Sequence, residues 1–261
     1  MFNEEISNDY AVYSETGSKG SQIKYCKNNF WYKQDSRCDE GIVECLVSEV
    51  LKHSSLAQKE YVIYEHGVVN NKHACRSKDF TENGKYTFVT LEKAYSQLTG
   101  RSLTEKVRAM DVIEERRDFV LDFFRRYYEF DLTDYFNKVF TLDLITLNED
   151  RHFNNLGVFL SDDGITNAPI FDNGLSLLNG NQSVNRHLSI DENVKRVITK
   201  PFAGSPERQY KLFSQGFSLD YNSLESALGE YPDSFYKSIL LHQLERHKPA
   251  FSSEPGTMNN F

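Results

Sequence analysis

The feature that most constrains the fold of this chain is an apolar helical stripe that ends abruptly in a polar loop. Over residues 132–147, large apolar side chains recur at helical spacing, which predicts a helix with a buried face. Residues 148–155 (NEDRHFNN) follow at once and are almost entirely polar. Polar groups beside a core are costly unless they have partners, so we expect this loop to carry a function.

The segments after this loop predict a β-hairpin that brings the chain back to it. Residues 156–160 and 165–171 have the pattern of strands, and residues 161–164 (SDDG) have that of a tight turn. The second strand ends in an Asp-Asn-Gly sequence that begins with Asp172. We therefore expect Asp172 to lie close to the polar loop.

Asp150, Asn155 and Asp172 suit phosphoryl transfer. The D-x-x-x-x-N spacing of the first two is that of the kinase catalytic loop. Asp150 would accept the proton of an attacking hydroxyl, while Asn155 and Asp172 offer the oxygen ligands that Mg²⁺ prefers. Each residue also has an ordinary alternative, because Asp150 can pair with an arginine such as Arg151, Asn155 can cap a turn, and D-N-G is a common turn.

The first part of the chain predicts a β-rich unit. Residues 22–33 (QIKYCKNNFWYK) predict a hairpin that turns at the central Asn-Asn pair, because asparagine tolerates a positive φ. Residues 61–65 and 86–91 predict further strands, with a polar stretch, residues 70–85, between them.

Two features of this unit are typical of an ATP site. Residues 39–54 predict an amphipathic helix with Glu44 on its more polar side, and Lys33 ends the preceding strand. In kinase folds such a lysine and glutamate hold the α and β phosphates of ATP; the alternative is two surface charges. The Gly/Ser-rich residues 14–21 form either a phosphate-cradling loop or a plain surface turn.

The composition of the chain limits which partners the protein can have and in which compartment it acts. The chain has 261 residues, with 38 acidic and 30 basic side chains and a net charge of −8, which argues against nucleic acid as the main partner. No apolar stretch approaches the roughly 18 residues that cross a bilayer, and the start of the chain has no readable export signal. The four cysteines include no C-x-x-C pair, so we expect a reducing, cytoplasmic setting.

On these motifs the chain resembles the HipA-type Ser/Thr protein kinases of bacteria, in their short, stand-alone form. Residues 20–24 (GSQIK) match the G-x-Q-x-K phosphate loop of that family. Residues 148–155 match its N-x-D-x-H-x-x-N, and residues 168–172 (APIFD) match its A-P-x-Y-D. Lys33 and Glu44 stand where the family has its strand lysine and helix glutamate.

The resemblance implies ATP and Mg²⁺ as cofactors and a Ser or Thr hydroxyl of a protein as the acceptor. Asp150 would be the catalytic residue that orients or deprotonates this hydroxyl, and His152 would be either a second catalytic group or a structural one. Asn155 and Asp172 would hold Mg²⁺. The residues expected to hold ATP are Gly20, Ser21, Gln22, Lys24, Lys33 and Glu44.

The resemblance also implies regulation and partners. Toxin members are silenced by autophosphorylation of the phosphate loop, and Ser18 or Ser21 would be the site in this chain. An antitoxin or another regulatory protein would be a partner, and the protein would act in a bacterial cytoplasm or be delivered into a host cell. The chain departs from the family at Asn154, where many members have a lysine that steadies the transferred phosphoryl group.

The predicted fold is α+β and two-lobed, as in protein kinases. Residues 1–92 would form an antiparallel, β-rich N-lobe, and residues 93–261 a mostly helical C-lobe that includes a helix over residues 110–128. The nucleotide would lie between the lobes. Two other functions stay open, namely a pseudokinase or nucleotide-binding regulatory module, and a kinase for a lipid or small-molecule acceptor.

Overall fold

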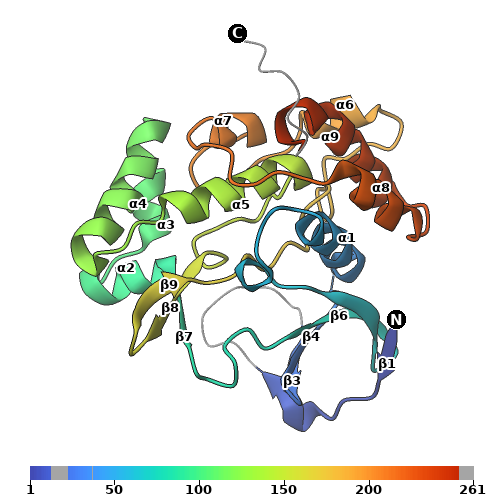
Figure 1. The fold of residues 1–261 in the computed structure, drawn as a ribbon, viewed down its shortest axis with the longest axis horizontal. Helices are drawn as coiled ribbons and strands as arrows, with labels where there is room; N and C mark the ends of the chain where they lie inside the picture. The colour runs from blue at the N-terminus through green and yellow to red at the C-terminus, as the bar shows by residue number, and fades with distance from the viewer. Residues whose placement is uncertain (13–22, 37, 253–261) are drawn as a thin grey trace.

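The protein has a strand-rich lobe and a helical lobe. The structure is a computed structural model that describes residues 1–12, 23–36 and 38–252. Figure 1 shows the strand-rich lobe at the lower right and most of the helices above it and to its left. Across these residues, every helix is too short or too polar to cross a membrane. The predicted two-lobed α+β fold is confirmed.

A six-stranded sheet forms the first lobe, with the strand order β1-β5-β6-β4-β3-β2. All neighbouring strands are antiparallel except β1 and β5. The predicted hairpin is confirmed, and Asn28 and Asn29 turn it with positive φ angles of 51° and 65°. The strands are β1 (Phe2–Glu4), β2 (Ala11–Val12), β3 (Lys24–Lys27), β4 (Phe30–Gln34), β5 (Glu65–Val69) and β6 (Lys72–Lys78).

Two strand predictions in this lobe are wrong. Strand β5 begins only at Glu65, and in residues 61–64 Tyr61 forms an isolated bridge to Ile170 instead. The central strand β6 lies inside the stretch for which the sequence predicted no strand. Its sequence, KHACRSK, has few apolar side chains. Cys75 packs in a cluster with Cys45 of α1, Ala74 packs on the other face with Tyr25 and Tyr32, and the long polar side chains lie at the ends.

Helix α1 (Glu40–Lys52) is buried on nearly all sides, although the sequence predicted an amphipathic helix with a polar face. One side of α1 packs on β5 and β6, and another packs on α8 (Tyr221–Gly229) of the second lobe. Glu44 is buried as well, with 1% of its surface exposed, because it faces Lys33 of β4 and the backbone of Asn173. A buried carboxylate needs partners, and the active-site region supplies them.

A three-stranded sheet, in the order β7-β8-β9, links the two lobes. Its strands are β7 (Thr87–Thr90), β8 (Gly157–Ser161) and β9 (Gly164–Asn167), and both neighbouring pairs are antiparallel. The predicted hairpin after the polar loop is therefore confirmed, although its second strand ends earlier than predicted. Strand β8 begins directly after the polar loop, so this hairpin fixes where the loop ends.

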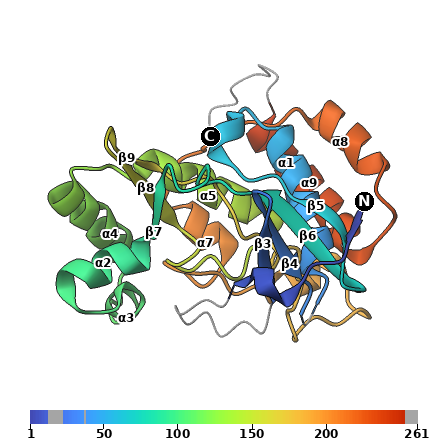
Figure 2. The same ribbon diagram turned by 90° about the horizontal axis from the view of Figure 1, so that it is seen from below.

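Helices make up most of the second lobe. Helices α4 and α5 lie within the two predicted ranges, and Figure 2 shows α5 in the middle of the lobe, next to α7. The helices are α2 (Leu91–Thr99), α3 (Leu103–Arg108), α4 (Ile113–Tyr128), α5 (Thr133–Thr146), α6 (Ile190–Val194), α7 (Pro206–Tyr210), α8 (Tyr221–Gly229) and α9 (Phe235–Phe251), with short 3₁₀ turns at Asn8–Tyr10 and Gln58–Glu60.

An aromatic cluster anchors the segment before α7 to α5. Phe202 is fully buried, with its ring centroid 5.7 Å from those of Phe136, Phe140 and Phe153. Phe213 stacks on Phe140 with 4.6 Å between the ring centroids. Edge-to-face and offset contacts of this kind add to the free energy of burial. These contacts hold the loop around Phe202 against α5.

We expect Phe202→Ala to lower the free energy of unfolding by about 3–5 kcal/mol, because it removes a buried ring and leaves a cavity. Urea denaturation would measure the loss. Ile198→Ala is the matched control, since Ile198 lies in the same segment with 67% of its surface exposed; it should change stability by less than about 0.5 kcal/mol. Equal effects of the two substitutions would contradict the anchoring role of Phe202.

Candidate active site

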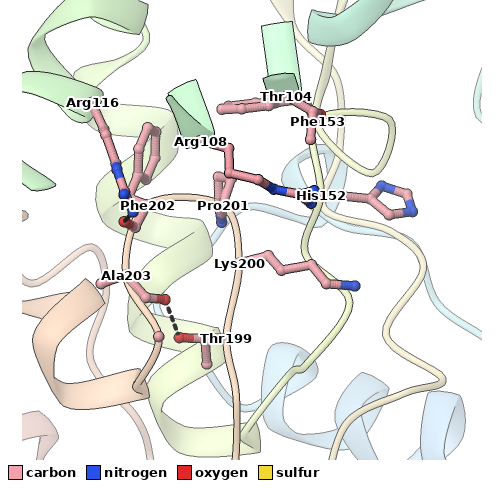
Figure 3. A pocket seen from close by; sticks show the side chains of 11 residues that line it. Thr104, Arg108, Arg116, His152, Phe153, Thr199, Lys200, Pro201, Phe202 and Ala203 are labelled. Carbon is pink, nitrogen blue, oxygen red and sulfur yellow. Dashed lines mark hydrogen bonds between the residues drawn. The ribbon is translucent and has the colours of Figure 1, made fainter. Parts of the chain in front are cut away.

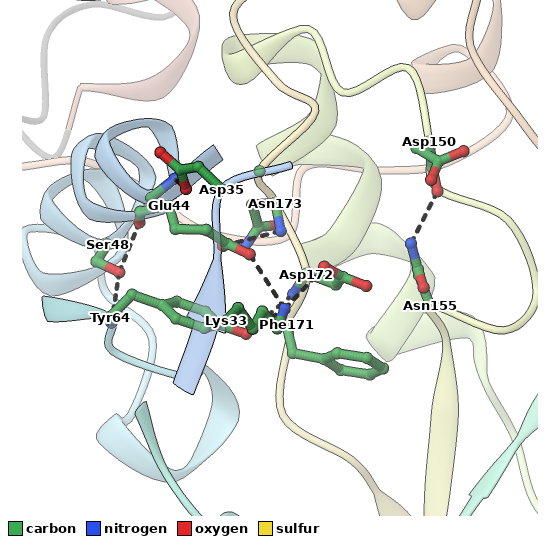
Figure 4. Close-up of polar contacts among 12 residues, drawn as sticks. Lys33, Asp35, Glu44, Ser48, Tyr64, Asp150, Asn155, Phe171, Asp172 and Asn173 are labelled. Atoms are coloured by element: carbon green, nitrogen blue, oxygen red, sulfur yellow. Dashed lines mark hydrogen bonds and ion pairs between the residues drawn. The ribbon is translucent and has the colours of Figure 1, made fainter. Parts of the chain in front are cut away.

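The ammonium group of Lys33, on β4, contacts two carboxylates. Its Nζ lies 2.8 Å from Oδ1 of Asp172 and 3.4 Å from Oε1 of Glu44 (Figure 4). Lys33 and Glu44 were predicted as a pair, and the structure brings them into contact. Asp172, which the sequence placed near Asp150, joins this pair from the segment after β9.

Backbone hydrogen bonds hold the segment that carries Asp172 against the first lobe. The N–H of Asn173 donates to Oε2 of Glu44 at 2.9 Å, and the N–H of Asp172 donates to the hydroxyl of Tyr64 at 3.3 Å. Lys33 lies over the ring of Tyr64, 5.0 Å from its centroid. The buried glutamate on α1 therefore positions both the lysine and the chain next to Asp172.

Lys33 and Asp172 keep their ordinary charges despite burial. Burial alone would lower the pKa of Lys33, but the carboxylates of Asp172 and Glu44 outweigh it and raise that pKa above its usual range. Burial would raise the pKa of Asp172, but the ammonium groups of Lys33 and Lys24 hold it below its usual range. An ammonium and a carboxylate are thus available for phosphate and for a cation.

Lys24 lies beside Lys33, because the two residues are directly opposite each other in the β3–β4 pair. Burial, and then the positive charge of Lys33, lower the pKa of Lys24. Like charges opposite each other in a sheet are destabilising, so two lysines here favour a bound anion. The structure thus places Lys24 with Lys33, as expected for residues that hold ATP phosphates.

The rest of the predicted phosphate loop lies outside the described residues. This applies to Gly20, Ser21 and Gln22, and to Ser18 as the second candidate for autophosphorylation. The expectations for these four residues remain predictions from the sequence.

Asp150 lies in the polar loop after α5, with its side chain 31% exposed. Its Oδ1 is 2.8 Å from Nζ of Lys200, and its Oδ2 is 3.6 Å from Nε2 of His152. Its N–H donates to Oδ1 of Asn148 at 2.8 Å. Asp150 therefore faces basic groups on the outer side of the loop and is not paired with Arg151.

Asn155 ends the polar loop and lies on the side of Asp172 away from Lys33, as Figure 4 shows. Its Nδ2 donates to the backbone oxygen of Asp150 at 3.0 Å, which directs its Oδ1 away from that bond. Asp172 has a φ of 59°, a left-handed conformation that non-glycine residues rarely adopt and that is common at functional sites.

The oxygen atoms of Asn155 and Asp172 fit the donor set of Mg²⁺, which binds proteins through one or two side-chain oxygens and completes its shell with water and substrate phosphates. Groups of three or more His, Cys, Asp or Glu with metal-site geometry are absent among residues 1–12, 23–36 and 38–252. A site with only two protein ligands, one of them an asparagine, is consistent with that absence.

Asn154 stands where a lysine was noted in related sequences. Its side chain is exposed, and its Oδ1 accepts a hydrogen bond from Oγ1 of Thr90 at 3.2 Å. The cation next to Asp150 comes from Lys200 instead, which lies in the segment between α6 and α7. Sequence reasoning missed Lys200, because no local spacing connects the two residues.

Arg151, which the sequence offered as a possible partner of Asp150, is fully buried. Its guanidinium contacts both carboxylate oxygens of Asp143 at 3.0–3.3 Å. It also donates to the backbone oxygen of Phe171 at 2.7 Å and to Oδ1 of Asn173. Arg151 thus ties α5 to the residues on both sides of Asp172. An aspartate inside the apolar stripe of α5 was the available sequence signal for this partner.

The lobes and the residues between them define a protein-kinase-like fold. No protein-family model and no curated protein sequence matches the chain. Among solved structures, the chain is similar to the proinflammatory kinase CtkA of Helicobacter pylori, with a TM-score of 0.59 and 18% identity over 88% of this chain and 90% of that one. The match bears out the kinase-type fold expected from the HipA-like motifs.

A second solved structure is HipA of Shewanella oneidensis MR-1, in complex with HipB and operator DNA. Its TM-score is 0.41, with 12% identity over 91% of this chain and 62% of that one. A similarity at this level carries no argument about the chain.

We expect Asp143→Ala to lower the free energy of unfolding by about 3–5 kcal/mol, because it leaves the buried guanidinium of Arg151 without its counter-charge. Asp134→Ala is the matched control on the same helix: the carboxylate of Asp134 pairs with Lys138 but its side chain is 70% exposed, so the loss should be below about 1 kcal/mol. Chemical denaturation of both variants would measure the difference. Similar losses would contradict a structural role for the buried pair.

A second prediction concerns the start of α1, where Oδ1 of Asp35 accepts the N–H of Gly41 at 2.8 Å. Burial, with nearby acidic side chains adding to it, raises the pKa of Asp35 from 3.8 to about 6 although that N–H opposes the rise. Between these two values the folded state binds the proton more tightly than the unfolded state, so the contribution of Asp35 to stability falls as the pH rises.

Asp35→Asn should remove this dependence. The free energy of unfolding of the wild type, measured relative to that of Asp35→Asn, should decrease from pH 4 to pH 6 and level off above it. Urea denaturation across this range tests the prediction, and a difference that is constant with pH would contradict it.

Proposed function

We propose that the protein transfers the γ-phosphoryl group of ATP to a Ser or Thr hydroxyl of a protein, with Mg²⁺. The observation that carries the proposal is the convergence of Lys33, Glu44 and Asp172 at one point next to the loop of Asp150 and Asn155. A strand lysine fixed by a helix glutamate, a metal-type aspartate and a loop aspartate are the parts that phosphoryl transfer requires.

Lys33 and Lys24 hold the phosphates in this proposal. Both ammonium groups lie on one face of the β3–β4 hairpin, and Lys33 has two carboxylate partners. If Asp172 held a metal ion, Glu44 would remain to orient Lys33. The neighbouring lysines then meet the negative charge of the phosphates, which relieves their mutual repulsion.

Asn155 and Asp172 would hold Mg²⁺. When bound, the metal ion would neutralise part of the negative charge of the ATP phosphates. The chain's own contribution is rigidity, because Arg151 fixes the backbone before Asp172 and the side chain of the residue after it. Glu44 accepts the backbone N–H of that same following residue.

Asp150 would accept the proton of the acceptor hydroxyl. It is partly exposed, and its carboxylate faces Lys200 and His152. A carboxylate within reach of the acceptor hydroxyl can take up its proton as a general base. His152 would orient this carboxylate, a role that its position beside Oδ2 supports.

The choice of a protein hydroxyl rests on the resemblance to HipA-type kinases. The same resemblance supports residues 1–92 and 93–261 as the two lobes around the nucleotide, an antitoxin or other regulatory partner, and autophosphorylation at Ser18 or Ser21. These parts of the proposal are tested together with the transfer itself.

We expect the wild-type protein, incubated with Mg²⁺ and γ-labelled ATP, to label itself or a generic protein substrate. Asp150→Ala should lower the rate about 10²- to 10⁴-fold, because it removes the proton acceptor. Asp172→Ala should abolish labelling by removing a metal ligand. Mass spectrometry of the labelled chain should find phosphate on Ser18 or Ser21.

Asp162→Ala is the control, because Asp162 is an exposed aspartate in the β8–β9 turn, away from these contacts. It should leave labelling unchanged. A wild-type protein that binds ATP in a thermal-shift assay but transfers no label to any protein would contradict the proposal and favour a nucleotide-binding module or a non-protein acceptor.

A further inference from the structure

A pocket opens beside Asp150. It has a volume of about 200 Å³ and lies between the end of α3, the polar loop and the segment before α7 (Figure 3). Lys200 and His152 line it, and both contact the carboxylate of Asp150. The pocket is therefore adjacent to the group that would receive the acceptor hydroxyl.

The walls of this pocket are firmly held. Buried Gln209 accepts the N–H groups of Phe202 and Ala203 at 3.0 and 3.3 Å, and it donates to the backbone oxygen of Lys200 at 2.7 Å. The hydroxyl of Thr199 donates to the backbone oxygen of Ala203 at 2.8 Å. The turn that carries Lys200 is thus fixed at both ends, so the shape of the pocket exists before any ligand binds.

Positive charge gathers in the pocket, although the chain as a whole has a net charge of −8. Arg108, Arg116 and Lys200 line it, and its described lining includes no aspartate or glutamate. Lys200 pairs with Asp150, so the two arginines carry the excess positive charge. Arg116 donates to the backbone oxygens of Met110 and Phe202, which positions its charge without neutralising it.

Arg108 is the cation of this pocket that is open to a ligand. Its side chain is exposed at the end of α3 and, within the part of the chain that the structure describes, has no carboxylate partner. Figure 3 shows it directed into the pocket, toward His152. Nearby, the carboxylate of Glu92 is engaged by the N–H groups of Leu103 and Thr104, so it does not compete for Arg108.

The pocket is also partly apolar, since Phe153, Pro201 and Phe202 contribute to its walls. Low-polarity walls strengthen the field of fixed charges by excluding water. A volume of about 200 Å³ has room for a carboxylate side chain together with a few waters, each of which occupies roughly 30 Å³.

From these observations we infer that the pocket binds an aspartate or glutamate side chain that lies near the acceptor Ser or Thr, so that the protein selects acidic acceptor sequences. This inference rests on the proposed function and specifies its substrate class. Arg108 contacts the carboxylate, Arg116 adds charge from the wall, and Lys200 connects the pocket to Asp150. Binding of the acidic side chain brings the neighbouring hydroxyl to Asp150.

The test uses peptides with a central serine in which each neighbouring position is, in turn, Glu, Ala or Lys. The wild type should use the best Glu peptide with a kcat/KM about tenfold above that of its Lys counterpart, which corresponds to about 1.4 kcal/mol. Arg108→Glu should abolish or reverse this preference. Arg101→Glu is the matched control, because Arg101 is an exposed arginine just before α3 that does not line the pocket, and it should keep the preference.

Several outcomes would overturn the inference. Equal use of Glu and Lys peptides by the wild type would do so, as would an acidic preference that survives in Arg108→Glu. If the protein preferred peptides with phosphoserine or an apolar residue next to the acceptor, and showed no preference for Glu there, the pocket would not bind a carboxylate side chain. Thermal unfolding and ATP binding show whether Arg108→Glu folds. If it does not, Arg108→Gln, which only removes the charge, takes its place and should abolish the preference.

The two levels of the proposal fail differently. A wild type that labels neither itself nor any peptide would overturn the proposed function and this inference together. A wild type that labels itself and shows no preference among the peptides would overturn the inference alone.

Discussion

The active-site region depends on one buried ion pair, between Arg151 and Asp143. Burying a guanidinium costs free energy unless its charge is paired and its N–H groups are hydrogen-bonded. Here helix α5 supplies the carboxylate of Asp143, and the segment around Asp172 supplies a backbone oxygen and an amide oxygen. The pair therefore links the core helix to the residues that flank Asp172. Because Arg151 directly follows Asp150, the same pair limits where the loop carboxylate can lie. A single interaction in the core thus sets the relative positions of both acidic groups.

The charged side chains of the site form two regions. On one side, Lys24 and Lys33 face Asp172 and the buried Glu44, an arrangement suited to phosphates and a metal ion. On the other side, Lys200 faces Asp150 and continues into a pocket with further basic groups. Asp150 lies at the boundary between a nucleotide region and an acceptor region. In a chain with excess acid overall, the described lining of that pocket is basic and includes no carboxylate, which favours an anionic ligand there.

The sequence predicted those parts of the fold that depend on short-range patterns. The stripes of α4 and α5, the Asn-Asn turn of the first hairpin and the spacing of Asp150 and Asn155 are local, and the structure has them. Strand β6 was missed, because its polar sequence becomes a central strand only when α1 covers it. The strand predicted over residues 61–65 failed for the converse reason. Its Tyr and Val side chains pack into the core from an extended connection without forming a ladder.

The sequence by itself determined which chemical groups the site can contain, because the order and spacing of a lysine, a glutamate, two aspartates and an asparagine are written in it. The tertiary structure alone decided which of these charges are partners. Lys200 reaches Asp150 across 50 positions, and Arg151 turns inward to Asp143 instead of outward to its neighbour. The reason is physical: the energy of a charge depends on its burial and on the distance to the opposite charge, and both are defined only when the helices and sheets have packed.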